Sequence, residues 1–231
     1  MTPPSVLRTF LFAPGNHPRR VEKALTLAAD LRTVDWMITN LERERGLPIG
    51  GIDLMPIIET AADFSRLDRI LAARSLKDYP GPWRVKRISF GAGDFTNDVG
   101  MTWTPGEQEL GELRIRMIVA SRAAGLEPPI DTVWIHLKEA GALRESVLRS
   151  LRMGFQGRLC IHPDQVSVVN AIFTPTPEDA ARAQRVVDAF KQAEAGGLAA
   201  IQVDGVFVDY PIVYRAQRVL ATLAAIGHRD G

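Results

Sequence analysis

The sequence lacks several features that would point to particular classes of protein. Cys160 is the one cysteine among 231 residues, so an internal disulfide and a multi-cysteine metal site are both excluded. No apolar run approaches the roughly 18 residues that a membrane-spanning helix needs, and the N-terminal stretch lacks a secretory signal pattern. We therefore expect a cytoplasmic protein without a membrane span. Because the segment "GRLCIHP" is apolar, we also expect the thiol of Cys160 to be buried and inert.

A strong net charge is also missing. Lys and Arg total 28 against 27 acidic residues, which leaves a net charge of +1. No bulk electrostatic attraction therefore points to nucleic acid or to an acidic membrane surface, and we predict neither partner. The length is sufficient to bury the core of one α/β domain.

Strand-like runs alternate with helical patterns along the chain. Five apolar, β-branched runs are bounded by Gly, Pro or polar clusters: "LRTFLFAP", "GGIDLMPIIET", "VKRISFGAGDF", "IDTVWIHL" and "GRLCIHP". Between them, apolar residues recur three and four positions apart, as in Phe64, Leu67, Ile70 and Leu71. Since such continuously apolar strands are buried on both faces, the pattern predicts an α/β fold with helices over a parallel sheet.

The C-terminal part has a different pattern. After Gly196 and Gly197, "LAAIQVDGVFVDYP" predicts two short strands about the turn Asp204-Gly205, a hairpin that we expect to be appended to the sheet. A closing helix is predicted from Ile212 to about Ile226. We therefore expect residues 1–195 to form the main part of the domain and residues 196–231 to form a C-terminal extension of it.

Three carboxylates stand where strand patterns end. Glu59 closes "DLMPIIET", Asp94 closes "RISFGAGD" and Asp209 closes "GVFVD". Parallel sheets bind ligands at the carboxyl ends of their strands, and two carboxylates on successive strands suit Mg²⁺. Alternatively, Glu59 caps the helix that begins "TAADF" and Asp94 lies in a solvated loop. The pattern alone leaves both interpretations open.

Two further segments invite a phosphate-binding interpretation. In "GAGDFTNDVG", Gly91 and Gly93 lack the third glycine of a dinucleotide motif, so they indicate close backbone approach at a strand end and no more. The segment "APGNHPRRVEKA" places Arg19 and Lys23 in the first turns of a helix. They form either a solvated basic face or a contact to a phosphate-bearing substrate tail.

Several segments together resemble a known family. They occur in the order "RTFLFAPGNHPRRVEKA", "IIETA", "ISFGAGDFTNDVG", "GFQGRLCIHPDQVSVVNAIFTPTPEDAARAQRVVDAF" and "GVFVDYPIVYRAQRVL". In this order they resemble the citrate lyase β-subunit-like proteins of the HpcH/HpaI aldolase and citrate lyase superfamily. The resemblance implies a Mg²⁺-dependent TIM (β/α)₈ barrel. Such a barrel cleaves or forms carbon–carbon bonds in acyl-CoA thioesters of the citryl-CoA, malyl-CoA or citramalyl-CoA type by stabilising an enolate.

The resemblance also implies roles for individual residues. Glu59 and Asp94 would be the two protein ligands of Mg²⁺. Asp209 would handle the proton at the acyl-CoA carbon in the site of a neighbouring subunit, which implies a homo-oligomer, a trimer in related lyases. Arg19 and Lys23 fall where relatives contact the phosphates of CoA.

One part of the family pattern is missing. In "KALTLAADLRTVDW" one helical pattern continues into a second between Asp30 and Leu31, with no strand between them. About five barrel strands remain, and since a strand with its helix needs roughly 25 to 30 residues, about three units or ~80 residues are absent. Helical spacing continues across the join, so we predict one helix from about Pro18 to Arg45.

Five strands cannot close an eight-stranded barrel, because strand number, tilt and shear are linked. Two outcomes remain open. Either the molecule contains residues at this join that the sequence lacks, which predicts an ordinary family enzyme, or the molecule is shortened. In a shortened molecule the sheet edges would be exposed, covered by the long helix or paired with another subunit, and the first and fifth barrel strands would become neighbours. The family's substrate-binding arginine lies on an absent strand. A carbon–carbon lyase is the leading hypothesis, beside an acyl-CoA thioesterase on the same scaffold and a non-catalytic pseudoenzyme or interaction protein.

Overall fold

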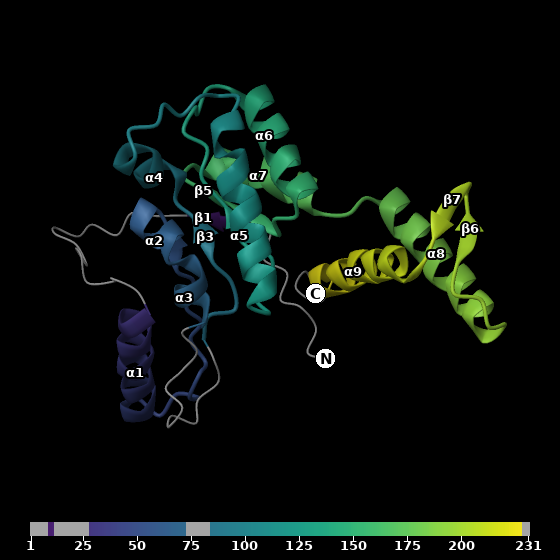
Figure 1. Cartoon of the computed structure of the whole chain (residues 1–231), viewed down its shortest axis with the longest axis horizontal. Helices are drawn as coiled ribbons and strands as arrows, with labels where there is room; N and C mark the ends of the chain where they lie inside the picture. The colour runs from purple at the N-terminus through teal and green to yellow at the C-terminus, as the bar shows by residue number, and fades with distance from the viewer. Residues whose placement is uncertain (1–8, 12–27, 73–83, 228–231) are drawn as a thin grey trace. The chain divides into compact units, whose positions relative to one another are not determined.

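The computed structural model describes residues 9–11, 28–72 and 84–227 (Figure 1). Contacts divide the chain into a larger unit, Thr9–Val169, and a C-terminal unit whose described part is 170–227. The two units are treated separately below. The predicted division at residues 195 and 196 stays a prediction, and Arg19 and Lys23 lie outside the described residues.

The larger unit contains a parallel five-stranded sheet in its described part. Its strands are β1 (Thr9–Leu11), β2 (Ile57–Ile58), β3 (Ser89–Phe90), β4 (Ile130–Asp131) and β5 (Gly157–Cys160). The strand order is β1-β5-β4-β3-β2, and every pairing is parallel. Each of the five runs expected to form a strand contains one of these strands. The prediction of an α/β fold with a parallel sheet is therefore confirmed.

Strands β1 and β2 lie at opposite ends of this sheet. Within the described residues β1 pairs with β5 and β2 pairs with β3. If three units are missing after β1, the first barrel strand is β1 and the fifth barrel strand is β2. The expectation that these two strands become neighbours is therefore wrong for the described residues. In the described sheet, β1 and β2 therefore each have one edge without a strand partner.

Helix α1 (Ala28–Glu44) lies beside the β2 edge. It continues through Asp30 and Leu31 without a break, which confirms this part of the predicted long helix; residues 18–27 lie outside the described residues. Leu31 and Val34 face a cavity of about 170 Å³, whose other wall includes residues 54–58. The helix thus lines this cavity together with the segment that contains β2, and it packs against α3 (Leu67–Ala72).

A buried arginine holds α1 in this position. The Arg84 guanidinium donates to the carboxylates of Asp35 and Glu42 and, at 2.8 Å, to the hydroxyl of Thr39. Hydrogen bonding to Arg84 is the main reason that the pKa of Glu42 falls to about 2. The same carboxylate accepts hydrogen bonds from the backbone of Gly50 and Ile52, just before β2. The polar side of α1 is therefore directed into the protein.

The other helices of the larger unit cover the sheet (Figure 1). They are α2 (Ala61–Ser65), α3 (Leu67–Ala72), α4 (Ala92–Asp98), α5 (Gly111–Ala123), α6 (Ala140–Met153) and the first part of α7 (Pro163–Phe173), with a 3₁₀ turn at Gln108–Leu110. The boundary between the two units falls within α7. Phe64, Phe90 and Phe95 form an edge-to-face cluster in the core, with ring centroids 4.8–6.2 Å apart. This cluster packs α2 and α4 against β3.

Four charged residues are fully buried between strands β4 and β5 and helices α5 and α6. Arg114 lies 3.1 Å from Asp131 and 3.2 Å from Glu107, and Arg158 lies 3.1 Å from Glu107. We call Glu107, Arg114, Asp131 and Arg158 the buried ion cluster. Burial opposes ionisation of Asp131, but the charges of Arg114 and Arg158 hold its pKa below the usual value. Opposite charges therefore compensate one another within the buried ion cluster.

The C-terminal unit has its own core. Helices α8 (Pro177–Ala195) and α9 (Tyr210–Gly227) pack with the hairpin β6 (Ile201–Val203) and β7 (Val206–Val208). Asp204 and Gly205 both have positive φ, 50° and 77°, which fits a two-residue hairpin turn. Buried Phe190, Val208 and Val213 hold these elements together.

The hairpin and the closing helix are thus confirmed, and the helix begins two residues earlier than predicted. The expectation that the hairpin is appended to the main sheet is wrong for the described residues. There β6 and β7 form a separate two-stranded sheet, because their apolar side chains pack against α8 and α9.

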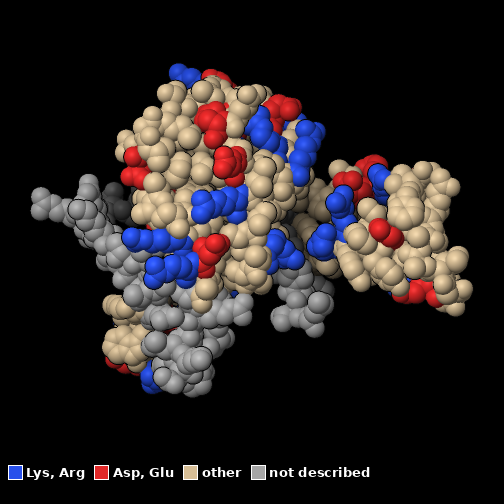
Figure 2. Space-filling view, viewed as in Figure 1, with Lys and Arg blue, Asp and Glu red and all other residues tan. Residues whose placement is uncertain are grey.

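Acidic and basic side chains both occur across the face of the molecule in Figure 2, in keeping with the net charge of +1. Among the residues that the structure describes, no helix combines the length and the apolar character that a membrane span requires.

Candidate functional site

Glu59 and Asp94 lie at the ends of adjacent strands, and the structure brings their carboxylates together. Glu59 directly follows β2, and Asp94 is in the first turn of α4, which follows β3. The pKa of Glu59 rises to about 7, mainly because the group is partly buried and then because of the charge and hydrogen bonding of Asp94. We call these two residues the carboxylate pair. A bound cation would relieve the repulsion between them.

The structural alternative is wrong for Glu59 and wrong in part for Asp94. Thr60 caps α2: its hydroxyl accepts a hydrogen bond from the Asp63 backbone at 3.1 Å, and the Asp63 carboxylate accepts from the Thr60 backbone at 3.0 Å. The same carboxylate accepts from the Glu59 backbone at 3.2 Å. Asp63 therefore holds the backbone of Glu59, and the side chain of Glu59 does not cap α2. Asp94 is exposed to solvent, as its alternative predicted, but it lies in a helix and not in a loop.

Gly91 makes room for the Glu59 side chain. A Cβ atom at Gly91 would lie 2.6 Å from the Glu59 Cβ and 2.8 Å from its Oε2. Real Cβ atoms do not approach other heavy atoms so closely, so any larger residue would displace Glu59. The predicted close approach at this strand end is confirmed for Gly91. At Gly93 the nearest neighbour of a Cβ would be 3.8 Å away, so no such need exists there.

Two side chains that the sequence did not reveal connect the elements around the pair. Thr132, which follows β4, accepts a hydrogen bond from the Ala92 backbone at 3.1 Å and so holds the start of α4. Asp98, at the end of α4, accepts one from the Ala61 backbone at 2.8 Å, at the start of α2. The spacing of four residues between Asp94 and Asp98 is the signal that places both on one helix face.

The donor set fits Mg²⁺ better than a transition metal. In the described ranges, no group of three or more His, Cys, Asp or Glu side chains is arranged to hold an ion. Zn²⁺ requires three or four such ligands, whereas Mg²⁺ typically binds one or two carboxylates and completes its octahedron with water and substrate oxygens. Two carboxylates in contact, with an elevated Glu59 pKa, suit that second arrangement.

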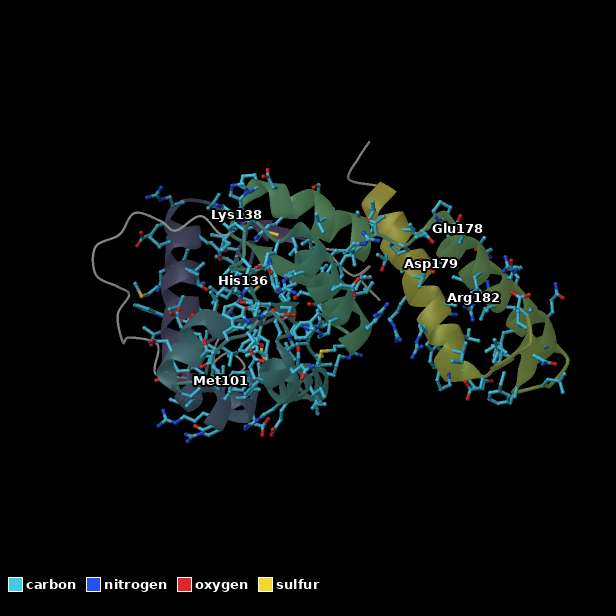
Figure 3. The ribbon with its side chains drawn as sticks, turned by 90° about the horizontal axis from the view of Figure 1, so that it is seen from above. Met101, His136, Lys138, Glu178, Asp179 and Arg182 are labelled. Atoms are coloured by element: carbon cyan, nitrogen blue, oxygen red, sulfur yellow. The ribbon has the colours of Figure 1, made fainter. Side chains whose placement is uncertain are left out.

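The segment that follows β4 also contributes polar groups to the larger unit. Figure 3 labels His136 and Lys138 on this segment, and Met101 beyond α4. The His136 ring packs edge-on against Trp134 with centroids 5.1 Å apart, and the Trp134 indole donates to the His136 carbonyl at 2.8 Å. The imidazole is thus held by packing against a buried tryptophan.

Asp209 lies between β7 and α9 in the C-terminal unit. Its backbone carbonyl accepts hydrogen bonds from Ile212 at 3.1 Å and from Val213 at 3.0 Å, which begins α9. The side chain is half-buried. Its role in proton transfer stays a prediction, and so do the CoA contacts of Arg19 and Lys23.

Cys160 behaves as the sequence indicated. It is buried in β5, and burial raises its pKa to about 11 despite the nearby charge of Arg158. A thiol of this kind remains protonated at neutral pH and is a poor nucleophile.

A parallel α/β sheet with paired carboxylates at neighbouring strand ends defines a class: α/β proteins with an acidic site, suited to a divalent cation, at the carboxyl edge of the sheet. The model of the HpcH/HpaI aldolase/citrate lyase family matches residues 24–163. The chain belongs to this family.

Named relatives and a solved structure agree with this assignment. Citrate lyase subunit beta of Leuconostoc mesenteroides is 34% identical over 194 residues, which are 84% of this chain and 61% of the relative. Mitochondrial citramalyl-CoA lyase of Rattus norvegicus is 30% identical over 176 residues, 76% of this chain and 52% of the relative. The chain therefore spans between about half and three fifths of the length of these relatives.

The structure of CitE from Mycobacterium tuberculosis in complex with magnesium, acetoacetate and coenzyme A matches with a TM-score of 0.66 at 20% identity. The match covers 94% of this chain and 68% of that one. At this level of identity the likeness concerns the fold.

Proposed function

We propose that this chain is a Mg²⁺-dependent lyase that cleaves or forms a carbon–carbon bond in an acyl-CoA thioester. The observation that carries the proposal is the convergence of Glu59 and Asp94 at adjacent strand ends in a member of the citrate lyase family. The names of the relatives, citrate lyase subunit beta and citramalyl-CoA lyase, support the reaction class. The ligands of the CitE complex, magnesium and coenzyme A, support the cofactor and the thioester substrate.

The sheet of the larger unit is inferred to be part of a (β/α)₈ barrel. In a closed barrel the strands follow one another in chain order and the last strand pairs with the first. The order β1-β5-β4-β3-β2 has this arrangement if β1 is the first barrel strand and β2 to β5 are the last four. About three β/α units would then lie between β1 and β2, on the side that α1 now borders. Residues 1–195 would form this partial barrel, and residues 196–231 its C-terminal extension.

Glu59 and Asp94 would hold Mg²⁺ through carboxylate oxygens, with water and substrate completing its coordination. When bound, the ion would supply positive charge and Lewis acidity beside the substrate oxygens. The chain's part in this is placement. Asp63 fixes the Glu59 backbone, and Gly91 leaves space for its side chain. Preorganised ligands of this kind need no rearrangement when the substrate binds.

Asp209 is proposed to exchange the proton at the acyl-CoA carbon, acting in the site of a neighbouring subunit of a homotrimer. Its place directly before α9, in the C-terminal extension where the resemblance puts the family's aspartate, supports this role. Arg19 and Lys23 are proposed to contact the CoA phosphates, for which their cationic side chains are suited.

Product analysis tests the reaction. The purified chain is incubated with citryl-CoA, malyl-CoA and citramalyl-CoA, with and without Mg²⁺, and the products are separated by mass spectrometry. A lyase releases a shorter acyl-CoA and a keto acid, whereas a thioesterase releases free CoA. We expect Glu59→Gln and Asp94→Asn to lower the rate at least about 100-fold. The matched control, Glu112→Gln at an exposed position of α5, should leave the rate unchanged. Release of free CoA alone would contradict the lyase proposal.

A non-catalytic role is the second candidate. The observation that favours it is that β2, which leads to Glu59, is an edge strand in the described sheet, while the chain covers 61% of its relative. Calorimetric titration with Mg²⁺ separates the two candidates. Binding that Glu59→Gln abolishes supports the enzyme, whereas a folded chain that binds no Mg²⁺ supports the non-catalytic role.

A further inference from the structure

We propose that Asp98 positions the two metal ligands by clamping α2 to α4, and that this clamp sets the selectivity of the site for Mg²⁺ over Ca²⁺. The inference rests on the proposed metal site. It adds a residue that does not itself contact the ion and a property, ion selectivity, that follows from the spacing of the ligands.

The clamp is a hydrogen bond between the two elements that carry the ligands. The Asp98 carboxylate accepts from the Ala61 backbone N–H at 2.8 Å. Ala61 is the first residue of α2, where N–H groups have no acceptor within the helix and where negative charge is favourable. Glu59 lies two residues before this point. The contact therefore acts immediately beside one of the two ligands.

The other end of the clamp lies one helical turn from the second ligand. Asp94 and Asp98 are four residues apart on α4 and share a face of it. A rotation or shift of α4 that moved Asp94 away from Glu59 would also pull Asp98 away from Ala61. Conversely, the hydrogen bond to Ala61 resists such a shift. Asp98 thus couples the separation of the two carboxylates to the docking of the two helices.

The neighbouring tethers act in different ways. Asp63 holds the Glu59 backbone from within α2, and Thr132 holds the start of α4 from the segment after β4. Phe64 of α2 also packs on Phe95 of α4, with ring centroids 4.8 Å apart, but this apolar contact has no fixed direction. The hydrogen bond from Ala61 to Asp98 is the polar link beside the ligands, so its loss would leave the aromatic packing intact and would loosen the separation of the two carboxylates.

A fixed ligand spacing matters more for Mg²⁺ than for Ca²⁺. Mg²⁺ requires near-ideal octahedral geometry with oxygen distances of about 2.0–2.1 Å, whereas Ca²⁺ accepts irregular geometry and distances of about 2.3–2.6 Å. Loosening the carboxylate pair should therefore weaken Mg²⁺ binding more than Ca²⁺ binding. The ratio of the two affinities reports on the clamp, because a general loss of folded protein would lower both affinities together.

The test is calorimetric titration of the full chain with MgCl₂ and with CaCl₂, for the wild type and four variants. In Asp98→Ala, Mg²⁺ affinity should fall by about 10-fold or more, in line with the effect of removing groups that orient metal ligands, and Ca²⁺ affinity by less than about 3-fold. In Asp98→Asn the amide oxygen can still accept the hydrogen bond, so the ratio should be largely restored. Asp68→Ala removes an exposed carboxylate of α3 as a charge control and should leave the ratio unchanged.

Ala61→Pro removes the donor and leaves Asp98 in place. Proline is favoured at the first position of a helix, and Thr60 already has the extended backbone, φ −135° and ψ 159°, that a following proline requires. This variant should fold and should show the same loss of Mg²⁺ selectivity as Asp98→Ala. It keeps the inference testable even if Asp98→Ala does not fold.

The outcomes separate this inference from the proposed function. If the wild type binds Mg²⁺ and both Asp98→Ala and Ala61→Pro keep the wild-type ratio, the clamp is overturned while the metal site stands. An equal loss for both ions in these two variants also overturns it. If the wild type binds neither ion, the proposed metal site fails, and the clamp fails with it.

Discussion

The buried ion cluster and the carboxylate pair place acidic side chains in opposite charge environments. Asp131 is fully buried between two arginines, and their charges hold its pKa below the usual value. Glu59 is only partly buried but faces Asp94, and its pKa rises to about 7. Buried opposite charges offset each other's cost of burial, whereas like charges brought together are costly and are common where a ligand is bound. The comparison therefore separates the acidic groups of the buried ion cluster from the two that we propose as metal ligands.

Of the variants proposed here, removal of an arginine from the buried ion cluster should change the free energy of unfolding most. In Arg158→Met, Glu107 would lose its partner at 3.1 Å and both acids of the cluster would remain buried with less compensation. We expect a loss of about 3–5 kcal/mol in the free energy of unfolding, measured by urea denaturation. Arg149→Met is the control, because Arg149 contacts Glu107 at 3.2 Å but its side chain is 38% exposed. Equal losses in the two variants would show that burial does not distinguish them.

Gly91→Ala tests the carboxylate pair by displacing Glu59. The new Cβ would meet the Glu59 Cβ at 2.6 Å, so the side chain or the strand end must shift. We expect a loss of about 1–3 kcal/mol from overpacking and, in titration calorimetry, clearly weaker Mg²⁺ binding. Gly93→Ala is the matched control, since its nearest contact would be 3.8 Å. Unchanged Mg²⁺ binding in Gly91→Ala would argue against Glu59 as a ligand.

The hydrogen bonds between Arg84 and Glu42 offer a second compensated acid, whose effect on stability depends on pH. The pKa of Glu42 falls from 4.5 to about 2 in the folded state, so its contribution to stability is complete above pH 4.5 and is lost as the pH falls toward 2. The urea concentration at the unfolding midpoint of the wild type should therefore be lower at pH 3 than at pH 7. In Arg84→Met the decrease should be smaller, because the hydrogen bonds that lower the pKa are absent. A decrease of the same size in both proteins would show that Arg84 does not set this dependence.

Cys160 should give the smallest effect. With a pKa of about 11, roughly one thiol in a thousand is ionised at pH 8. We expect no labelling by a thiol-specific chromogenic reagent in native buffer and one labelled thiol per chain in urea, as the sequence contains one cysteine. Rapid labelling of the native protein would show that the charge of Arg158 outweighs burial, in contrast to the prediction.

The main elements were accessible to sequence reasoning because they depend on local patterns. Apolar runs predicted all five strands of the sheet, and the Asp204-Gly205 turn predicted the hairpin. Glu59 and Asp94 could be paired in advance because parallel strands end at the same edge of a sheet. The capping role of Thr60 was missed, although the spacing from Thr60 to Asp63 is that of a capping box.

Contacts between distant segments were not accessible in the same way. Asp98 meets Ala61 across 37 residues, and Arg158 meets Glu107 across 51. Neither spacing corresponds to a helix or a strand period, so no local pattern marks the partners. The polar inward side of α1 was missed for the same reason, since Arg84 lies 42 residues beyond Glu42.

The sequence by itself determined the class of fold, the family and the two carboxylates, because periodicity and strand ends are properties of neighbouring residues. Only the tertiary structure decided which charges are compensated. It placed arginines beside Glu107 and Asp131 and left Glu59 facing Asp94. Electrostatic energy depends on distance and burial in three dimensions, and these are set when the chain brings remote segments together.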